Sequence, residues 1–314
     1  MLRFLSTNNI TGVRGNHDQK VIEWRGWLVW IKSLPGGLTW LEQVERKWNE
    51  SWNEEEEAEL GAWIEQQRCL SSQSSDKKWW KLVPKGWKLL GDHYKIARDI
   101  SDKDFQYLLF LPLRLYVPSV HVFIAHGGVL PSDPRYAMND KTKQPLARLP
   151  TLPGRRHFDD SSKKVEALRE LQDLHILMEI PQNKDPWVTL NMRSIRDGKV
   201  SRASDQGTPW TDMWAKQMKS CVGYGTSFEE DGDGIFVLKK HYSLPCYPST
   251  TIYGHAASRG LDIKRWSFGL DTGCVSGRFA CRPGYYSFNV GLREGFVGHH
   301  SLWEQDFRRR VRGR

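Results

Sequence analysis

The sequence predicts an α/β fold, and two observations carry this prediction. Apolar residues recur at helical spacing in "QKVIEWRGWLVWIKSL" (19–34) and "KKVEALRELQDLHILMEI" (163–180). Short apolar runs typical of buried strands end in glycine-containing loops, as in "VHVFIAHGG" (120–128) and "STTIYGHAAS" (249–258). Strands of this kind that alternate with amphipathic helices are typical of α/β proteins.

The first elements are a strand-like run at 11–14, a loop at 15–18 and a helix directly after it. "PGG" (35–37) is predicted to end this helix. Residues 39–78 are rich in Glu, Gln, Ser and Trp, and we expect them to form a charged, partly disordered insertion. The helix is indicated by four apolar residues at helical spacing: Val21, Trp24, Leu28 and Ile31.

After the insertion, "ISDKDFQYLLFLP" predicts a helix with Ser101 as its N-cap and Asp104 three residues on. Residues 131–160 are rich in Pro, Asp and Arg and are expected to be a long loop. Further on, "KRWSFGLDTGCV" (264–275) is another strand followed by a loop. Asp271 in this loop is expected to fix the loop rather than to bind metal.

Composition sets limits on the function. The 314 residues suffice for one large domain with an insertion, and no apolar run is long enough to span a membrane, so no membrane segment is expected in this chain. The net charge of +9 favours anionic ligands weakly, and no nucleic acid partner is expected. The five cysteines form no CxxC pair and are expected to be reduced thiols: Cys69, Cys221, Cys246, Cys274 and Cys281.

Histidine stands in three loops that follow strand-like runs: "VRGNHD", "FIAHGG" and "IYGHAAS". Asn16 through its carbonyl oxygen, and His126 and His255 through their rings, are all possible metal ligands, and imidazole suits Zn, Fe or Mn. A single histidine after a strand is more often structural than functional. The order Gly-Asn-His-Asp is not required by a turn, so the three loops together favour a metal site.

With these motifs, the chain resembles the calcineurin-like metallophosphoesterases. The resemblance rests on "TGVRGNHDQKVIEWR", "VFIAHGGVLPSDPRY", "TLNMRSIRDGKV" with "GTPWTDMW", and "TIYGHAASRGLDIKRWSFGLDTGCVSGR". Within the superfamily it looks most like the branch of diadenosine tetraphosphate hydrolases and fungal zinc-dependent vacuolar endopolyphosphatases. This resemblance implies a four-layer α/β/β/α sandwich with two mixed sheets, formed by residues 1–38 and 79–280.

The resemblance also implies a mechanism and a set of site residues. Two divalent ions (Zn, Mn or Fe) would orient the phosphate and generate a bound hydroxide for in-line attack. Asn16, His126 and His255 would hold one of these ions. His17 would protonate the leaving oxygen, and His17 and Asp18 are the expected catalytic residues. Three arginines in the matching motifs are expected to bind phosphate: Arg14, Arg135 and Arg193.

The chain departs from the family pattern at both ends. The family has D-x-H and G-D-x-x-D before the Gly-Asn-His-Asp motif, and neither precedes residue 15 here. This implies an N-terminally truncated member, with the first core strands missing and the first metal site incomplete. Residues 281–314 are unlike the family and are expected to be an atypical basic tail.

The resemblance favours polyphosphate as substrate, then a dinucleoside polyphosphate, then a phosphoprotein. The alternative, from another class, is a non-catalytic polyanion-binding protein that has lost the first metal site. A vacuolar location is implied by the resemblance alone, and a cytoplasmic one stays open.

Overall fold

The computed structural model describes residues 2–51, 57–71, 76–148, 161–223, 228–230, 236–238 and 243–273. The chain divides into two units, Met1–Phe279 and Ala280–Arg314. The second unit, and with it the predicted basic tail, lies outside the described residues. In the described part of the chain, no helix combines the length and the apolar character that crossing a membrane requires.

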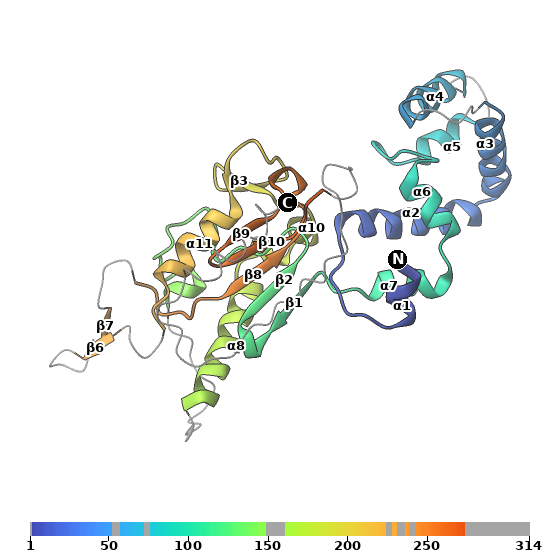
Figure 1. The fold of residues 1–314 in the computed structure, drawn as a ribbon. Coiled ribbons are helices and arrows are strands. Elements are labelled where there is room, and N and C mark those ends of the chain that lie inside the picture. Colours follow the sequence, from blue (N-terminus) through green and yellow to red (C-terminus); the bar gives the residue numbers. More distant parts are fainter. Residues whose placement is uncertain are drawn as a thin grey trace, which may run out of the picture. The chain divides into compact units, whose positions relative to one another are not determined.

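Before position 111 the described residues form helices and the segments that connect them, with no strand among them (Figure 1). The predicted helix after the Gly-Asn-His-Asp motif is confirmed as α2, and its four predicted apolar residues are buried. The predicted N-cap of α7 is also confirmed, because Ser101 Oγ accepts a hydrogen bond from the Asp104 N–H at 3.2 Å. The helices are α1 (Leu2–Thr7), α2 (Asn16–Ser33), α3 (Gly37–Ser51), α4 (Glu57–Leu70), α5 (Lys77–Leu82), α6 (Asp92–Asp99) and α7 (Asp102–Phe110).

Tryptophan side chains build the core of this helical part. Trp24 of α2 contacts the rings of Trp27 and Trp87, and Trp40 of α3 stacks on Trp79 with ring centroids 5.9 Å apart. Large aromatic side chains bury much apolar area, so few residues suffice for a core. The abundance of tryptophan in the sequence is thus partly explained by this cluster.

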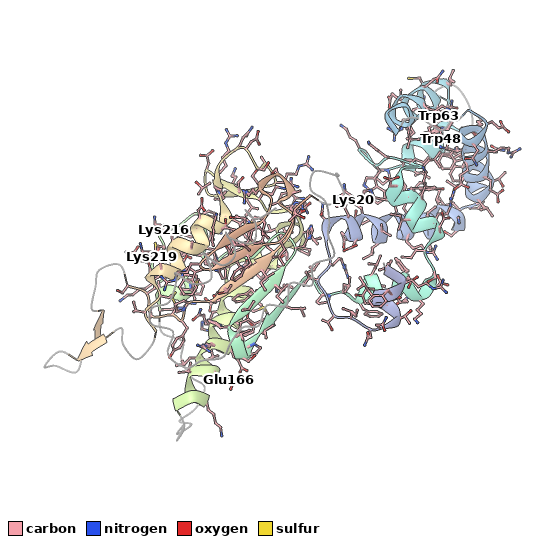
Figure 2. The ribbon with its side chains drawn as sticks, in the orientation of Figure 1. Lys20, Trp48, Trp63, Glu166, Lys216 and Lys219 are labelled. Carbon is pink, nitrogen blue, oxygen red and sulfur yellow. A yellow bond between two sulfur atoms is a disulfide. The ribbon has the colours of Figure 1, made fainter. Side chains whose placement is uncertain are left out.

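The segment 39–78 differs from its prediction. Its described residues form most of α3 and α4 together with the start of α5, and several of them are buried in the same apolar cluster as α2. Trp48 of α3 and Trp63 of α4 lie edge to face, with ring centroids 5.1 Å apart (Figure 2). In these helices the apolar residues recur at helical spacing and lie on one face, with charged residues on the other. The apolar face packs into the core, so the segment is part of the core and does not stand apart from it. Residues 52–56 and 72–75 lie outside the described residues.

A five-stranded mixed sheet forms the centre of the second half of the chain, in the order β1-β2-β8-β10-β9. The central strands β2, β8 and β10 are parallel, and the outer strands β1 and β9 are antiparallel to their neighbours. The α/β class is therefore confirmed. The strands are β1 (Arg114–Val117), β2 (Val122–Ala125), β8 (Thr250–Tyr253), β9 (Asp262–Lys264) and β10 (Ser267–Gly269).

A second sheet has the order β4-β3-β5, and both of its strand pairs are antiparallel. The resemblance implied a mixed sheet here. The local reason for the antiparallel pair is the two-residue turn between β3 and β4, where Asp197 and Gly198 both have positive φ, as tight hairpins require. The strands are β3 (Ser194–Arg196), β4 (Lys199–Ser201) and β5 (Thr208–Pro209), and a separate hairpin contains β6 (Phe228–Glu230) and β7 (Phe236–Leu238).

Helices pack beside the five-stranded sheet and complete its core (Figure 1). Phe123 of β2 packs on Trp214 of α11, and Ile176 of α8 belongs to the same buried cluster. The predicted helix at 163–180 is confirmed as α8. The predicted loop at 131–160 is confirmed over its described part, 131–148, apart from one short 3₁₀ turn at Pro145–Ala147. The helices are α8 (Ser161–Glu179), α9 (Pro181–Lys184), α10 (Pro186–Asn191) and α11 (Trp210–Ser220), with a further 3₁₀ turn at Pro118–Val120 and another at Ala257–Arg259.

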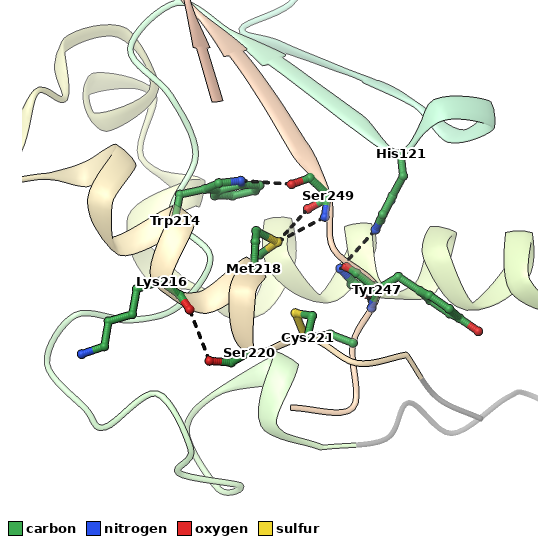
Figure 3. The surroundings of a disulfide bond; sticks show 10 residues. His121, Trp214, Lys216, Met218, Ser220, Cys221, Tyr247 and Ser249 are labelled. Carbon is green, nitrogen blue, oxygen red and sulfur yellow. Dashed lines mark hydrogen bonds between the residues drawn. A yellow bond between two sulfur atoms is a disulfide. The ribbon is translucent and has the colours of Figure 1, made fainter. Parts of the chain in front are cut away.

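A disulfide joins Cys221, at the end of α11, to Cys246, in the segment that leads to β8. The prediction of reduced thiols is wrong for these two residues. Sequence spacing gave no sign of the pair, because 25 positions separate the cysteines and only the packing of α11 brings their Cα atoms to 4.8 Å. Nearby, Ser249 donates hydrogen bonds to Met218 Sδ from its N–H and its hydroxyl (Figure 3). Cys69 is free and exposed, while Cys274 and Cys281 lie outside the described residues.

Candidate functional site

His126 and His255 follow two neighbouring parallel strands at the same edge of the five-stranded sheet. Ala125 at the end of β2 pairs with Tyr253 at the end of β8, so the residues just beyond them leave the sheet together. The two imidazole rings have centroids 5.0 Å apart. The carboxyl ends of parallel strands are where α/β proteins place binding groups. The prediction that strands precede these two histidines is confirmed.

Asn16 reaches the same place from α2. The Asn16 Oδ1 atom lies 2.8 Å from His126 Nε2, and because this oxygen is an acceptor, the ring nitrogen donates its hydrogen. The three predicted metal ligands, Asn16, His126 and His255, are thus brought together from distant parts of the sequence.

The residues before Asn16 differ from their prediction. Residues 11–15 belong to neither a strand nor a helix, and Asn16, His17 and Asp18 open helix α2 instead of standing in a loop. A backbone hydrogen bond holds this segment: the Arg14 N–H donates to the Pro112 carbonyl at 2.8 Å. A single bond of this kind does not make the repeated pattern that pairs two strands. Asp18 stabilises the helix start, because its carboxylate accepts the Gly15 N–H at 2.8 Å.

Two glycines pack against the ring of His126. A Cβ atom added at Gly15 would lie 3.2 Å from His126 Nδ1, and one added at Gly254 would lie 3.4 Å from the same atom. The contact at Gly15 is tighter than most real Cβ contacts, so a larger residue there would push on the ring, while the distance at Gly254 is that of ordinary van der Waals contact. Glycine at position 15 therefore lets the backbone approach the imidazole closely.

His255 occupies an unusual backbone conformation. Its φ of 56° is in the left-handed region, which costs a non-glycine residue about 1–2 kcal/mol. Its carbonyl accepts a hydrogen bond from Arg193 Nε at 2.9 Å, which holds the turn. Its buried Nε2 atom has no hydrogen-bond partner among the described residues. A strained turn that presents a buried, unpaired ring nitrogen is the expected signature of a ligand-binding histidine.

Both imidazoles are neutral at neutral pH. Burial lowers the pKa of His255 to about 3, and the nearby positive charge of Arg193 adds to this effect. Burial also lowers the pKa of His126, with partial opposition from the carboxylates of Asp18 and Asp271. Neutral rings have the lone pair that metal coordination requires.

The spacing of Asn16 Oδ1 and His126 Nε2 would suit two ligands of a single divalent ion. Ligand atoms at about 2.0–2.2 Å from one ion lie about 3 Å or slightly more from each other, close to the separation of Asn16 Oδ1 and His126 Nε2. To bind an ion through Nε2, the neutral His126 ring has to carry its hydrogen on Nδ1. Among the described residues, no group of three or more His, Cys, Asp or Glu side chains could hold a metal ion, so a second, carboxylate-rich set is not found there.

His17, the predicted proton donor, is exposed at the start of α2. Its Nδ1 atom lies 2.8 Å from Nε2 of His93, and the two rings are nearly parallel. Sequence reasoning missed His93, because "GDHYK" holds a single histidine with no metal-ligand or catalytic spacing. His17 is close enough to His126 and His255 for its charge to lower the pKa values of both.

The three predicted phosphate-binding arginines have different surroundings. Arg193 lies at the site, where burial lowers its pKa and Asp271 partly compensates. Arg14 donates to Gln19 Oε1 at 3.0 Å and to the Leu109 carbonyl, so part of its guanidinium is used structurally. Arg135 forms an ion pair with the buried carboxylate of Asp133 at 2.6 Å.

Asp271 has the role that the sequence predicted. Its Oδ1 atom accepts the Gly273 N–H at 3.0 Å and so fixes the loop after β10. The negative charge of Asp271 nevertheless acts on the site. It raises the pKa values of His126 and Arg193, while burial lowers them.

Comparison with known proteins gives little further information. Neither a protein-family model nor a curated protein matches this chain. Among solved structures, the chain is similar to the crystal structure of a candidate diadenosine tetraphosphatase, with 16% sequence identity and a TM-score of 0.36. The match covers 88% of this chain but 64% of that one, so this chain spans less than two thirds of its length. A likeness of this size supports no argument about function.

Proposed function

We propose that this protein is a metal-dependent hydrolase of phosphoester or phosphoanhydride bonds, with polyphosphate as its leading substrate. The observation that carries the proposal is the convergence of Asn16, His126 and His255, three side chains from distant segments of the chain. The resemblance to calcineurin-like metallophosphoesterases implies metal binding by these same residues.

The charges around the site support an anionic substrate. Arg193 lies within electrostatic range of Arg202 and Arg259, and the carboxylate of Asp271 opposes them, while that of Asp18 acts on His126. A local excess of positive charge attracts a polyanion and holds phosphate oxygens. Polyphosphate therefore fits this site better than a singly phosphorylated protein, and a dinucleoside polyphosphate comes second.

Each residue of the site has a distinct role in this proposal. Asn16, His126 and His255 hold the ion, and Arg193 orients a phosphate next to it. When bound, a divalent ion supplies Lewis-acid polarisation of a phosphoryl oxygen. His17 stands at the exposed side of the site, where it donates a proton to the leaving oxygen.

The test uses the full chain and measures binding and hydrolysis separately. Equilibrium dialysis with Mn²⁺ or Zn²⁺ is followed by assays of phosphate release from polyphosphate, diadenosine tetraphosphate and a phosphopeptide. We expect the unaltered chain to bind an ion and to hydrolyse polyphosphate best. Asn16→Ala and His255→Ala should each weaken metal binding by roughly tenfold or more.

His175→Ala is the matched control. His175 lies on α8, where its ring is 3.8 Å from Glu179, and it has no place in the proposed site. The His175→Ala variant should therefore bind metal and hydrolyse polyphosphate as well as the unaltered chain does. Metal binding that needs Asn16 but brings no hydrolysis of any substrate would favour the polyanion-binding alternative. Metal binding that is unaffected by Asn16→Ala and His255→Ala would refute the proposed site.

A further inference from the structure

We propose that His93 is the positioning residue for His17, and that it holds the His17 ring by accepting the Nδ1 hydrogen. This inference rests on the proposed function, in which His17 is the proton donor. The observation behind it is the 2.8 Å separation between His17 Nδ1 and His93 Nε2, with ring planes 16° apart. This distance is that of a hydrogen bond between the two imidazoles.

Two well-packed helices bring these rings together. His17 lies in the first turn of α2, and His93 is the second residue of α6. Two turns further along α2, the ring of Trp24 packs edge to face on the ring of Tyr94, with ring centroids 5.4 Å apart. Tyr94 is the residue next to His93. Tyr94 is fully buried, and its hydroxyl donates to Glu45 at 2.6 Å. The position of His93 is therefore set by a buried contact between its own helix and that of His17.

The direction of the hydrogen bond decides what His17 can do. A general acid gives away a proton at one ring nitrogen, and the other nitrogen needs a partner that fixes the tautomer and the ring orientation. If His93 Nε2 accepts the Nδ1 hydrogen, Nε2 of His17 is the nitrogen left to meet the substrate. In His17 the Nδ1 atom is the one occupied by His93, which agrees with this arrangement.

The proton transfer balances with this arrangement. As a water oxygen bonds to phosphorus and the bond from phosphorus to the leaving oxygen breaks, the electron pair of the broken bond stays on the leaving oxygen, and protonated His17 gives its Nε2 hydrogen to that oxygen. His17 is then neutral and still carries the Nδ1 hydrogen that it donates to His93. His93 keeps its own hydrogen on Nδ1 throughout and gives up none, so it takes part in the proton transfer only by positioning His17.

The first test reads the tautomer of His17 in the full chain, without any need for activity. Long-range ¹H–¹⁵N correlation spectra distinguish a hydrogen on Nδ1 from one on Nε2. We expect the hydrogen of neutral His17 on Nδ1 in the unaltered chain. In His93→Ala it should move to Nε2, the tautomer that free histidine prefers. His93→Gln keeps an acceptor at this position and should restore part of the Nδ1 form.

Lys95→Ala is the control, because Lys95 is exposed on the same helix and has no part in the contact. It should leave the His17 spectrum unchanged. Thermal unfolding of each variant shows whether the helices remain packed. A His17 tautomer that is the same with and without His93, in chains that are folded, would overturn the inference.

The second test is kinetic and separates this inference from the proposed function. His93→Ala should lower kcat for polyphosphate by roughly tenfold or more, with KM and metal affinity nearly unchanged. An activated aryl phosphate, which needs little help from an acid, should be affected much less. If the unaltered chain hydrolyses nothing, the proposed function fails while the spectra still decide the role of His93. If the chain is active and His93→Ala has normal kinetics, this inference alone fails.

Discussion

The side-chain oxygen of Asn16 accepts a hydrogen bond of 2.8 Å from the ring of His126, although 110 positions separate the two residues in the sequence. Asn16 opens helix α2, and His126 follows strand β2. This contact connects the helical segment to the edge of the sheet where His255 also lies, and the predictions about metal binding and turnover depend on it.

Asn16→Ala and His17→Ala should have different effects, although the residues are adjacent. Asn16→Ala removes an expected ligand and should lower metal occupancy and activity together. His17→Ala removes the proton donor, so it should slow turnover by about 10²–10⁴-fold with metal occupancy nearly intact. The comparison of polyphosphate with an aryl phosphate checks this, because the loss should be largest for the poorer leaving group. Loss of metal in His17→Ala, or an equal loss with both substrates, would contradict the role given to His17.

The chain should bind at most one divalent ion, and weakly. The described residues offer one converging set of ligands, Asn16, His126 and His255, and no carboxylate among them to bridge a second ion. Elemental analysis after dialysis measures the number of ions per chain. Two tightly bound ions would mean that other residues supply the ligands.

The disulfide between Cys221 and Cys246 should stabilise the fold around α11. Replacing both cysteines with serine should lower the free energy of unfolding by about 2–4 kcal/mol, because the closed loop no longer restricts the unfolded chain. Denaturant unfolding measures the loss, and Cys69→Ser is the control, because Cys69 is exposed and free. Rapid alkylation of Cys221 in the denatured, non-reduced protein would show that this bond does not form.

Trp40 should be essential for the helical part of the chain. Its side chain is 3% exposed and packs on Trp79 and Trp80, so Trp40→Ala should lower the free energy of unfolding by about 3–5 kcal/mol. Trp40→Phe should cost much less, because the indole N–H has no hydrogen-bond partner among the described residues. Trp30→Ala is the control, since Trp30 is 44% exposed. Equal melting temperatures for Trp40→Ala and Trp30→Ala would mean that α3 does not belong to the core.

Stability should depend on pH through His121, which is 2% exposed. Gln172 Nε2 donates to His121 Nε2 at 3.2 Å, and burial, with the charge of Arg169, lowers the ring's pKa to about 3. In the unfolded chain His121 binds a proton near pH 6.5, whereas in the folded chain it stays neutral down to about pH 3. The stability that neutral His121 contributes to the folded state is therefore lost as the pH falls from about 6.5 to about 3. Denaturant unfolding at a series of pH values measures it.

His121→Asn is the matched variant, because Asn tolerates the positive φ of this position and does not titrate. Its stability should depend less on pH in this window. Asp173 acts in the opposite direction: burial raises its pKa to about 6, so between about pH 6 and 4 its contribution to stability increases as the pH falls. Because both proteins contain Asp173, the difference between them isolates His121. Parallel pH curves would contradict the assignment.

Several elements could be predicted from the sequence because their cause is local. The apolar spacing from Val21 to Ile31 defines α2, and Ser101 caps α7 through its own side chain. His126 and His255 were found because each follows an apolar run that is long enough for a strand and lies next to a glycine. The expectation that they share a site came from the three histidine loops taken together and from the resemblance, and the parallel pairing of β2 with β8 brings the two histidines to the same edge of the sheet.

Other features depend on residues far apart in the chain, and the sequence pattern alone gave misleading or no signals for them. The run at 11–14 has the composition of a strand, but no neighbouring strand pairs with it in the structure. The residues that follow it begin a helix. The charged segment after residue 39 becomes part of a core, because its apolar residues face those of α2 and α5.

By itself, then, the sequence determined the helical periodicity and the strand ends with their histidines, both of which depend on neighbours within a few positions. Only the tertiary structure decided that Cys221 pairs with Cys246, that Arg135 is paired with Asp133, and that His93 meets His17. Side-chain partners of this kind are set by how helices and strands pack on one another. Packing is a property of surfaces that the whole chain builds, and no short stretch of sequence contains it.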